Sequence, residues 1–240
     1  MAKEQQTVLI MAEEVSLRRM LRTALRDSGF AVEEFCSAPE TTQSLRRRKV
    51  DLTILDIDKM PGSAGIMLCR EVRALGQSMG ILLLAASDFE KSIVQAFEAG
   101  ADDYIAKPFR AGELIGRCHV VLRRISGPNT VAPTSITAGE LELNLARREF
   151  RRAGKLVHLT PTEFNLLELL MKHRGRAVSH VEILRSIWGP EYGKELEYLR
   201  SYIRLLRKKI EPDPAQPKYL LTEPWMGYRF CVPSNSDHVA

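Results

Sequence analysis

Three charged side chains in the first half of the chain each follow a short apolar run. Glu13 follows the first of these runs, Asp56 the third and Lys107 the fifth. If the runs are parallel strands of one sheet, their carboxyl ends share one edge, where ligands of such sheets bind. Two acids there could hold Mg²⁺ beside a carboxylate that attacks a phosphoryl group, while a lysine stabilises the developing charge. Acids at strand ends are equally typical of solvated surface, so this pattern alone leaves both interpretations open.

A second group of candidate residues lies on a helical pattern over residues 195–210. At roughly 100° per residue, one stripe of this pattern is apolar and consists of Leu199, Ile203, Leu206 and Ile210. The opposite arc carries cationic and short polar side chains, namely Arg200, Ser201, Arg204, Arg207 and Lys208. Arginine contacts DNA phosphates and reads guanine edges through a bidentate fork. A basic helix face is also common as a plain solvated face, so the flanking elements must decide.

The elements that would position the first group alternate between strand-like and helix-like patterns. Strands are predicted at Val8–Met11, Val32–Phe35, Leu52–Leu55, Ile81–Ala85 and Tyr104–Ala106. Helices are predicted over Leu17–Leu25, Pro39–Arg48, Ile66–Leu75, Phe89–Ala99 and Glu113–Ile125. Continuous apolar strands alternating with helices indicate an α/β doubly wound, five-stranded parallel sheet that is covered on both faces.

The second half has a different pattern. Residues 126–135 are rich in proline, glycine and small polar residues, as in a linker. Ile136–Leu143 and Glu149–Leu159 predict a small antiparallel sheet, and three helices follow, two of which open with capping boxes at Thr160 and Ser179. A terminal hairpin is predicted from Tyr219–Thr222 and Tyr228–Cys231. This order is that of a winged helix-turn-helix, and we expect domains at 1–125 and 136–233 with a tail at 234–240.

Composition and charge bound the class of protein. The chain has 240 residues, of which 45% are hydrophobic and 27% charged, values that argue against disorder. Residues 126–240 hold 17 Lys and Arg against 13 Asp and Glu, which suggests an anionic partner. No apolar run approaches the roughly 18 residues of a membrane span, and the first residues carry no apolar signal core. The scattered cysteines predict reduced thiols rather than disulfides, so we expect a cytoplasmic protein that does not bind membranes.

The first half resembles the receiver domain of bacterial two-component response regulators. The matching segments are VLIMAEE, DLTILDIDKMPGSAG and GADDYIAKPF, within residues 7–125. The resemblance implies that Asp56 is the phosphoacceptor and Lys107 its partner, with a cis peptide bond before Pro108. It also implies a histidine kinase as phosphoryl donor, and weak binding of Mg²⁺ by Glu13 and Asp56, although no cofactor is strictly required.

Three departures from the family pattern bear on phosphorylation. Ala12 stands where a first acid is usual, and Ala85 replaces the switch hydroxyl after the fourth strand. The loop after Asp56 is one residue longer than usual, so Asp58 could refill the pocket. We therefore expect phosphorylation at Asp56 to be impaired or dispensable. The alternative is a conventional regulator activated by phosphotransfer to Asp56.

The second half resembles the effector domain of the OmpR/PhoB family. The segments are LTPTEFNLLELL, VEILRSIWG, YLRSYIRLLRKKIEPDP and YLLTEPWMGYRF, and WGPEY with EPDPAQPKYLLTEP is most similar to a KdpE-like branch. The resemblance implies that the helix over 195–210 enters the major groove of double-stranded DNA and that the hairpin lies at the minor groove. It places Arg200, Ser201 and Arg204 nearest the bases. The phosphate-contact candidates are Arg207, Lys208, Trp188, Thr222 and Arg229.

Several of these DNA-contact assignments have structural alternatives. Trp188 could be entirely core, and Arg229 could tie the hairpin to the helix. Many relatives carry Arg-Gly at the wing tip, where this chain has Pro224-Trp225. Electrostatic minor-groove contact through that position is therefore absent, and Trp225 could stack on sugar or pack against the domain.

The resemblance also implies protein partners. Receivers of this branch pair through the fourth helix, fifth strand and fifth helix, and the candidate residues for that dimer interface are Lys91, Asp102, Asp103, Glu113 and Arg117. The alternative is an ordinary solvated surface, because isolated exposed ion pairs contribute little. The loop over 189–194 corresponds to the segment that contacts RNA polymerase in relatives.

Three classes of function remain in competition. A phosphatase built on the doubly wound half is disfavoured because no Ser/His/Asp or Cys/His constellation accompanies the acids, and we expect no enzyme. A protein-interaction module without a specific DNA target would show DNA affinity that does not depend on salt. We expect a DNA-binding transcription regulator with an atypical receiver.

Overall fold

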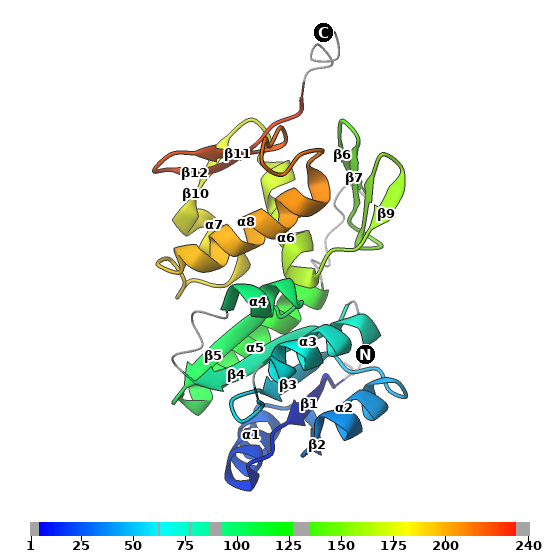
Figure 1. Cartoon of the computed structure of the whole chain (residues 1–240). Coiled ribbons are helices and arrows are strands. Elements are labelled where there is room, and N and C mark those ends of the chain that lie inside the picture. The colour runs from blue at the N-terminus through cyan, green and yellow to red at the C-terminus, as the bar shows by residue number, and fades with distance from the viewer. Residues whose placement is uncertain (1–4, 62, 77, 87–92, 127–134, 234–240) are drawn as a thin grey trace. The chain divides into compact units, whose positions relative to one another are not determined.

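The computed structural model describes residues 5–61, 63–76, 78–86, 93–126 and 135–233. The chain divides into two compact units, one ending at Gly127 and the other beginning at Pro128 (Figure 1). Each unit is considered by itself. Most of the expected linker, the expected tail and Lys91 lie outside the described residues.

The first unit is built on a five-stranded parallel sheet. The strands lie in the order β2-β1-β3-β4-β5 and comprise β1 (Thr7–Met11), β2 (Ala31–Phe35), β3 (Leu52–Asp56), β4 (Gly80–Ala86) and β5 (Asp103–Lys107). Strand order reverses between β1 and β3, so the carboxyl ends of these two strands flank the crevice where ligands of doubly wound sheets bind. The predicted fold class is confirmed for this half.

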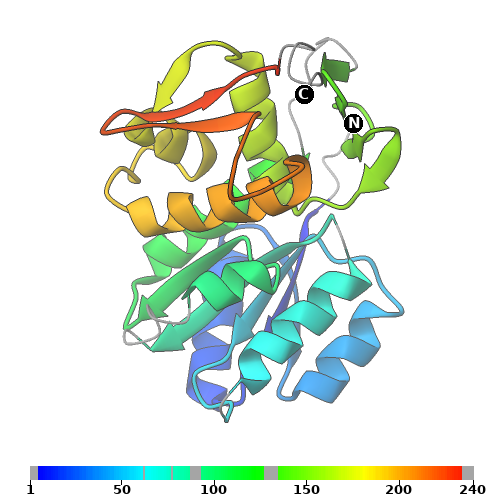
Figure 2. The same ribbon diagram turned by 45° about the horizontal axis from the view of Figure 1, so that its top comes forward.

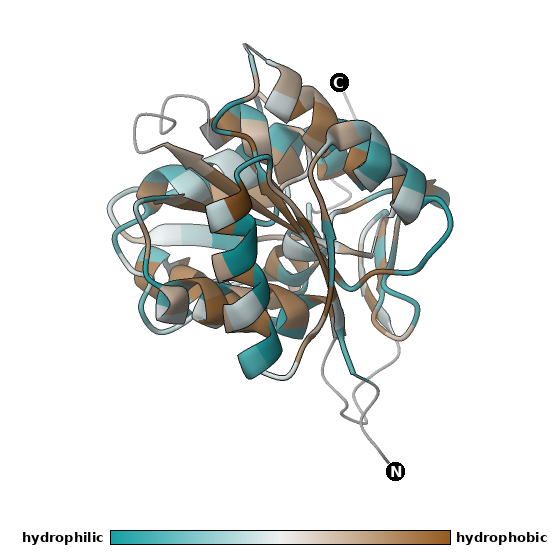
Figure 3. Cartoon of the chain, turned by 90° about the horizontal axis from the view of Figure 1, so that it is seen from below, coloured by the Kyte–Doolittle hydropathy of each residue, from teal (hydrophilic) through white to brown (hydrophobic). Residues whose placement is uncertain are grey.

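Within the described residues, five helices cover this sheet. They are α1 (Val15–Asp27), α2 (Ala38–Leu45), α3 (Ala64–Leu75), α4 (Ile93–Glu98) and α5 (Ala111–Ser126). Helices α1 and α5 pack together and bury the core that includes Leu21, Leu25 and Val121 against the central strands, whereas α2 and α3 pack on each other. Figure 3 shows largely brown, hydrophobic strands between helices in which hydrophobic and hydrophilic segments alternate. Burial on both faces explains why β3 and β4 are apolar without alternation.

The second unit contains two antiparallel sheets and three helices. A four-stranded sheet is formed by β6 (Ser135–Ala138), β7 (Leu141–Asn144), β8 (Glu149–Arg152) and β9 (Lys155–Val157). The helices are α6 (Pro161–Lys172), α7 (His180–Ile187) and α8 (Leu196–Ile210). The second sheet has the order β10-β12-β11, with β10 (Ala177–Ser179), β11 (Leu220–Glu223) and β12 (Gly227–Phe230). The hairpin β11–β12 follows α8, as a winged helix-turn-helix requires (Figure 2).

The two predicted capping boxes differ in the structure. At α6, Glu163 N donates to Thr160 Oγ1 (3.3 Å) and Thr160 N donates to the Glu163 carboxylate (2.7 Å), so this box is confirmed. At α7, Glu182 N donates to Ser179 Oγ (3.1 Å), but the Glu182 carboxylate binds Arg176 at 2.8 Å. The second box is therefore only half formed, because an arginine outside the helix takes the carboxylate.

Candidate functional site

The carboxyl ends of β3 and β5 bring Asp56 and Lys107 together. Lys107 Nζ lies 2.6 Å from Asp56 Oδ1, and the Asp56 side chain is only 3% exposed. The same ammonium lies 3.5 Å from Asp58 Oδ2, so two carboxylates share one lysine. The peptide bond between Lys107 and Pro108 is cis, as the resemblance implied. An acid of this kind, held by a cation in a crevice, is chemically suited to accept a phosphoryl group.

The neighbours of Asp56 supply little further chemistry. Ala85, in β4, is 1% exposed and Ala12 is fully buried, and neither offers a polar side-chain atom. Glu13 is exposed at the end of β1. Glu14 instead turns to Ser16 and to Lys59, which lies at 3.5 Å, and the hydrogen bond from Ser16 with the charge of Lys59 lowers the pKa of its carboxyl.

The donor set at this edge does not form a ready-made cation site. Among the described residues, no three His, Cys, Asp or Glu side chains cluster closely enough to hold a metal ion. The ammonium of Lys107 engages one oxygen of each carboxylate, Oδ1 of Asp56 and Oδ2 of Asp58. Mg²⁺ takes a near-octahedral set of oxygens and usually keeps several waters beside one or two carboxylates, so these residues would supply only part of such a set.

The residues expected at a dimer face are largely engaged within the chain. Asp102 is fully buried and pairs with Arg73 of α3 at 2.5 Å, so its expected place at the surface is wrong. Asp103 is also fully buried and pairs with Arg117 at 3.2 Å; burial raises the pKa of the Asp103 carboxyl, and Arg117 opposes that rise. Arg117 also lies 3.2 Å from Glu113, which is exposed on α5. Arg73 of α3 and Arg117 of α5 therefore provide these two buried aspartates with partners inside the unit.

Helix α8 separates an apolar side from a cationic side. The predicted stripe of Leu199, Ile203, Leu206 and Ile210 is buried. Arg200, Arg204 and Lys208 are exposed at intervals of four residues, so they lie on one line along the helix. The Arg200 guanidinium contacts Glu197 at 2.5 Å on the same face. The exposed line of cations is the part of the domain best suited to DNA phosphates and base edges.

Three residues expected at DNA lie elsewhere. Ser201 is 5% exposed and its hydroxyl donates to Glu197 O at 2.8 Å, so it does not face a ligand. Trp188 is fully buried against Tyr202, with ring centroids 5.2 Å apart, and is a core residue. Arg207 donates to Leu220 O from Nε (3.0 Å) and Nη2 (2.7 Å), so it fastens α8 to the hairpin rather than projecting toward phosphate.

The hairpin itself keeps some of its expected groups exposed. Thr222 is exposed, although its hydroxyl oxygen accepts a bond of 2.8 Å from Arg207. Arg229 lies 2.8 Å from Glu223 across the hairpin, so the alternative in which it ties the hairpin to the helix is not what the structure shows. Trp225 is fully exposed and does not pack against the domain.

Two residues near this surface were missed by the sequence interpretation. The ring of His180 meets Tyr228 edge-on at 5.5 Å, and burial together with the charge of Arg200 lowers the pKa of His180. Glu211, at the end of α8, is 1% exposed and its carboxylate accepts three backbone N–H groups, from Lys218, Tyr219 and Leu220. For His180, the sequence offered only its position at the predicted start of a helix. For Glu211 it offered no signal, because the sequence does not show which backbone groups a polar residue after a helix will bond.

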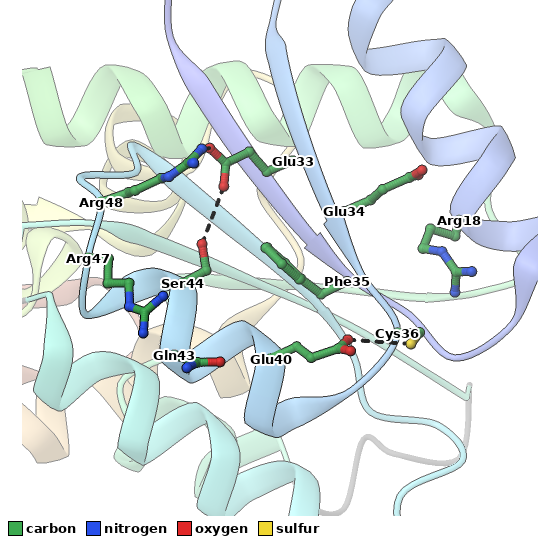
Figure 4. A pocket seen from close by; sticks show the side chains of 10 residues that line it. All are labelled: Arg18, Glu33, Glu34, Phe35, Cys36, Glu40, Gln43, Ser44, Arg47 and Arg48. Carbon is green, nitrogen blue, oxygen red and sulfur yellow. Dashed lines mark hydrogen bonds and ion pairs between the residues drawn. The ribbon is translucent and has the colours of Figure 1, made fainter.

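A separate hollow of about 580 Å³ lies against the edge strand β2 (Figure 4). Of its charged lining residues, Glu33 pairs with Arg48 at 2.8 Å, and Glu34 pairs with Arg22 of α1 at 2.8 Å. Cys36 Sγ lies 3.4 Å from Glu40 Oε2. This hollow is lined neither by Asp56 nor by a residue of α8. Within the described part of the chain, no helix is long and apolar enough to cross a membrane.

Comparison with known proteins identifies a family for each half of the chain. Residues 8–119 match the response regulator receiver domain, and residues 154–230 match the family described as transcriptional regulatory protein, C terminal. The KDP operon transcriptional regulatory protein KdpE of Escherichia coli (strain K12) is 39% identical over 226 residues, covering 94% of this chain and 99% of that protein. KdpE of Mycobacterium tuberculosis (strain ATCC 25618 / H37Rv) is 37% identical over 223 residues, covering 93% and 98%.

A solved structure supports the fold alone. A mutant of RitR has a TM-score of 0.76 and 21% identity, and the match covers 94% of this chain and 98% of that one. Both sequence relatives carry names of transcriptional regulators rather than of enzymes. The chain therefore belongs to the OmpR/PhoB-type two-component response regulators, homologous to KdpE, in which a receiver domain precedes a DNA-binding winged-helix domain.

Proposed function

We propose that this response regulator binds promoter DNA as a dimer and that phosphorylation of Asp56 is impaired or dispensable for that binding. The observation that carries the DNA-binding part is the line of Arg200, Arg204 and Lys208 on α8, opposite a fully buried apolar stripe. A helix anchored by one side and cationic on the other fits the major groove of B-DNA. Arg200 and Arg204 are the candidate base readers, and Lys208 is the candidate phosphate contact.

The receiver part rests on what surrounds Asp56. A phosphoryl group there would find Lys107, but Ala85 offers no hydroxyl to bond it. A ligand shifts a two-state equilibrium only as far as it interacts differently with the two states. Without the hydroxyl contact, phosphorylation has less interaction energy with which to favour an active state. The competing function is conventional activation, which is favoured by the intact Asp56–Lys107 pair.

The dimer and the other partners follow from the family rather than from a contact in this chain. Because Asp102 is buried against Arg73 and Asp103 pairs internally with Arg117, the candidate dimer face reduces to Glu113 and Arg117, together with Lys91 outside the described residues. A symmetric pair that occupies two half-sites gains affinity by linkage. RNA polymerase contact through residues 189–194 and a histidine kinase donor complete the proposal.

One experiment tests both parts. DNA bound by the full chain is selected from a random pool with and without acetyl phosphate and Mg²⁺, and the intact mass of the protein is measured in parallel. We expect a paired half-site to be enriched in both conditions, and Asp56→Ala to select the same sequence. An Ala85→Thr variant is the matched control, since it restores a hydroxyl at the end of β4.

Two results would separate the alternatives. A stable adduct of one phosphoryl group on wild-type Asp56, with DNA binding tightened by phosphodonor, would establish the conventional mechanism. Enrichment of no sequence under any condition, with affinity that does not fall with salt, would refute DNA recognition by α8.

A further inference from the structure

The tip of the β11–β12 hairpin presents large apolar side chains to solvent. Glu223 pairs with Gly227 across the hairpin, and Pro224, Trp225 and Met226 form the connection. Trp225 is 101% exposed and Met226 is 56% exposed. Tryptophan has one of the largest apolar side chains, and such side chains dominate the energetics of interfaces. Here the indole is entirely in solvent. The tip therefore carries an apolar contact surface that the fold itself does not use.

Trp225 also has an unfavourable backbone conformation. Its φ is +65°, in the left-handed region that is uncommon for bulky residues and natural for glycine. A glycine at this position would relieve the backbone and remove the exposed ring at once. Strained residues persist where surrounding structure fixes them, and they concentrate at binding sites. Exposure and strain thus coincide at one residue and point to a contact outside the domain.

The tip is held rigidly in place. A Cβ added to Gly227 would come within 1.9 Å of Val178 O, so the backbone here approaches β10 as closely as glycine allows. His180 N at the start of α7 donates to Met226 O at 3.1 Å, and Met226 N donates to Glu223 O at 3.1 Å. The two bonds of Met226 hold the backbone of the turn that carries Trp225, which lowers the backbone entropy that binding would cost.

The tip is continuous with the cationic side of α8. Arg207 bonds Leu220 O and Thr222 Oγ1, so it holds β11 beside the helix. The charge of Arg200 is close enough to lower the pKa values of His180, whose N–H bonds Met226 O, and of Tyr228, which follows Gly227 in β12, although burial raises the pKa of Tyr228 more. The nearest cation on the hairpin, Arg229, is paired with Glu223 at 2.8 Å. The surface that would meet DNA therefore changes from cationic on the helix to apolar at the tip.

We propose that Trp225, with Met226 beside it, is a specificity-determining contact that packs on the deoxyribose walls of the DNA minor groove. The inference rests on the proposed entry of α8 into the neighbouring major groove. Apolar side chains in the minor groove favour sequences that widen or unstack easily, such as TA steps. This contact selects flanking sequence through deformability, and because it neutralises no phosphate its contribution does not depend on salt.

The test uses the full chain and its selected DNA site, with flanking steps varied between TA and GC. Trp225→Gly removes the ring and suits the backbone, so thermal unfolding should occur at the same temperature or higher. We expect this variant to bind the TA-flanked site about tenfold more weakly. A tenfold loss corresponds to the free energy of burying part of one aromatic side chain. The slope of log affinity against log salt should stay unchanged. Trp225→Arg should steepen that slope by about one, and Leu156→Ala, at another exposed apolar residue, should change nothing.

Tryptophan fluorescence gives a second readout because the chain has two tryptophans and Trp188 is fully buried. DNA should protect wild-type emission from acrylamide quenching, and the protection should vanish in Trp225→Gly. The minor-groove contact of Trp225 is overturned if Trp225→Gly and wild type bind every flanking sequence with equal affinity. If Arg204→Ala still weakens binding in that case, the proposed function stands. Loss of all specific binding by wild type overturns both. Protection from acrylamide that rises with protein concentration in the absence of DNA assigns the ring to a second copy of the chain and overturns the minor-groove contact.

Discussion

Replacing Arg207 distinguishes an internal fastener from a DNA contact. Sequence periodicity places Arg207 on the same arc as Arg204, but its guanidinium is turned toward Leu220 O and Thr222 Oγ1. Burial lowers the pKa of Arg207, whereas the charges of Tyr228 and Glu211 oppose that shift. The guanidinium is therefore partly withdrawn from water, and the bonds that it donates to the hairpin offset that loss of hydration.

The size of the effect follows from those bonds. Two N–H groups of one cation reach a single carbonyl oxygen of a buried residue, and hydrogen bonds to charged groups are worth about 1.5–3 kcal/mol net. The bond to exposed Thr222 adds little. We expect Arg207→Ala to lower the free energy of unfolding of the effector unit by about 2–3 kcal/mol. Arg204→Ala, at an exposed position on the same helix, should change it by no more than about 0.5 kcal/mol.

Urea unfolding followed by fluorescence, with DNA titrations at several salt concentrations, measures both quantities on the same proteins. Below its unfolding transition, Arg207→Ala should keep the wild-type salt slope, because no phosphate contact is lost. Arg204→Ala should weaken specific binding by about 1–3 kcal/mol. The assignment of Arg207 is refuted if its alanine variant is as stable as wild type and loses one unit of salt slope.

Two further predictions concern groups that the sequence did not mark. Glu211→Ala removes the acceptor of three backbone N–H groups, so we expect a loss of about 3 kcal/mol in unfolding free energy. Urea unfolding measures this loss, with Glu191→Ala as an exposed control. An unchanged urea midpoint for Glu211→Ala would contradict the prediction. The pKa of His180 is lowered in the folded state by burial and by Arg200, so the unfolded chain binds the proton more readily. The stability due to neutral His180 is therefore complete above pH about 6.5 and is lost as pH falls through the folded pKa. His180→Gln should flatten that part of the stability profile, and identical profiles for the two proteins would rule this out.

The fold was predictable because its main signals are local. The unbroken apolar runs of β3 and β4 require burial on both faces, which only a parallel sheet between helices supplies. The capping box at Thr160 fixes the start of α6 through two residues that are close in the chain. Asp56 and Lys107 meet because the carboxyl ends of parallel strands share one edge. Strand β10 was missed because it has only three residues and carries no alternation.

The failures share a different cause. Helical periodicity gives the angle of a side chain about the helix axis, but it does not say which neighbour occupies that angle. The hairpin occupies the side of α8 on which Arg207 lies. Ser201 is buried, and its hydroxyl donates to the carbonyl of Glu197 in the same helix. Likewise, the adjacent acids Asp102 and Asp103 look like surface, yet Arg73 and Arg117 reach them from two different helices. These partners are distant in sequence, so no local pattern reports them.

Under the proposed function, the segment after β3 adds a second reason for weak phosphorylation control besides the missing hydroxyl. Asp58 N lies 3.4 Å from Asp56 Oδ1, and the Asp58 carboxylate lies 3.5 Å from Lys107 Nζ. A phosphoryl group on Asp56 would meet a lysine that already has a second anionic partner. With Ala85 unable to bond the group, the proposal expects little difference in free energy between the two receiver states on phosphorylation. The proposal then expects DNA occupancy to follow protein concentration, because binding of a pair to two linked half-sites follows mass action.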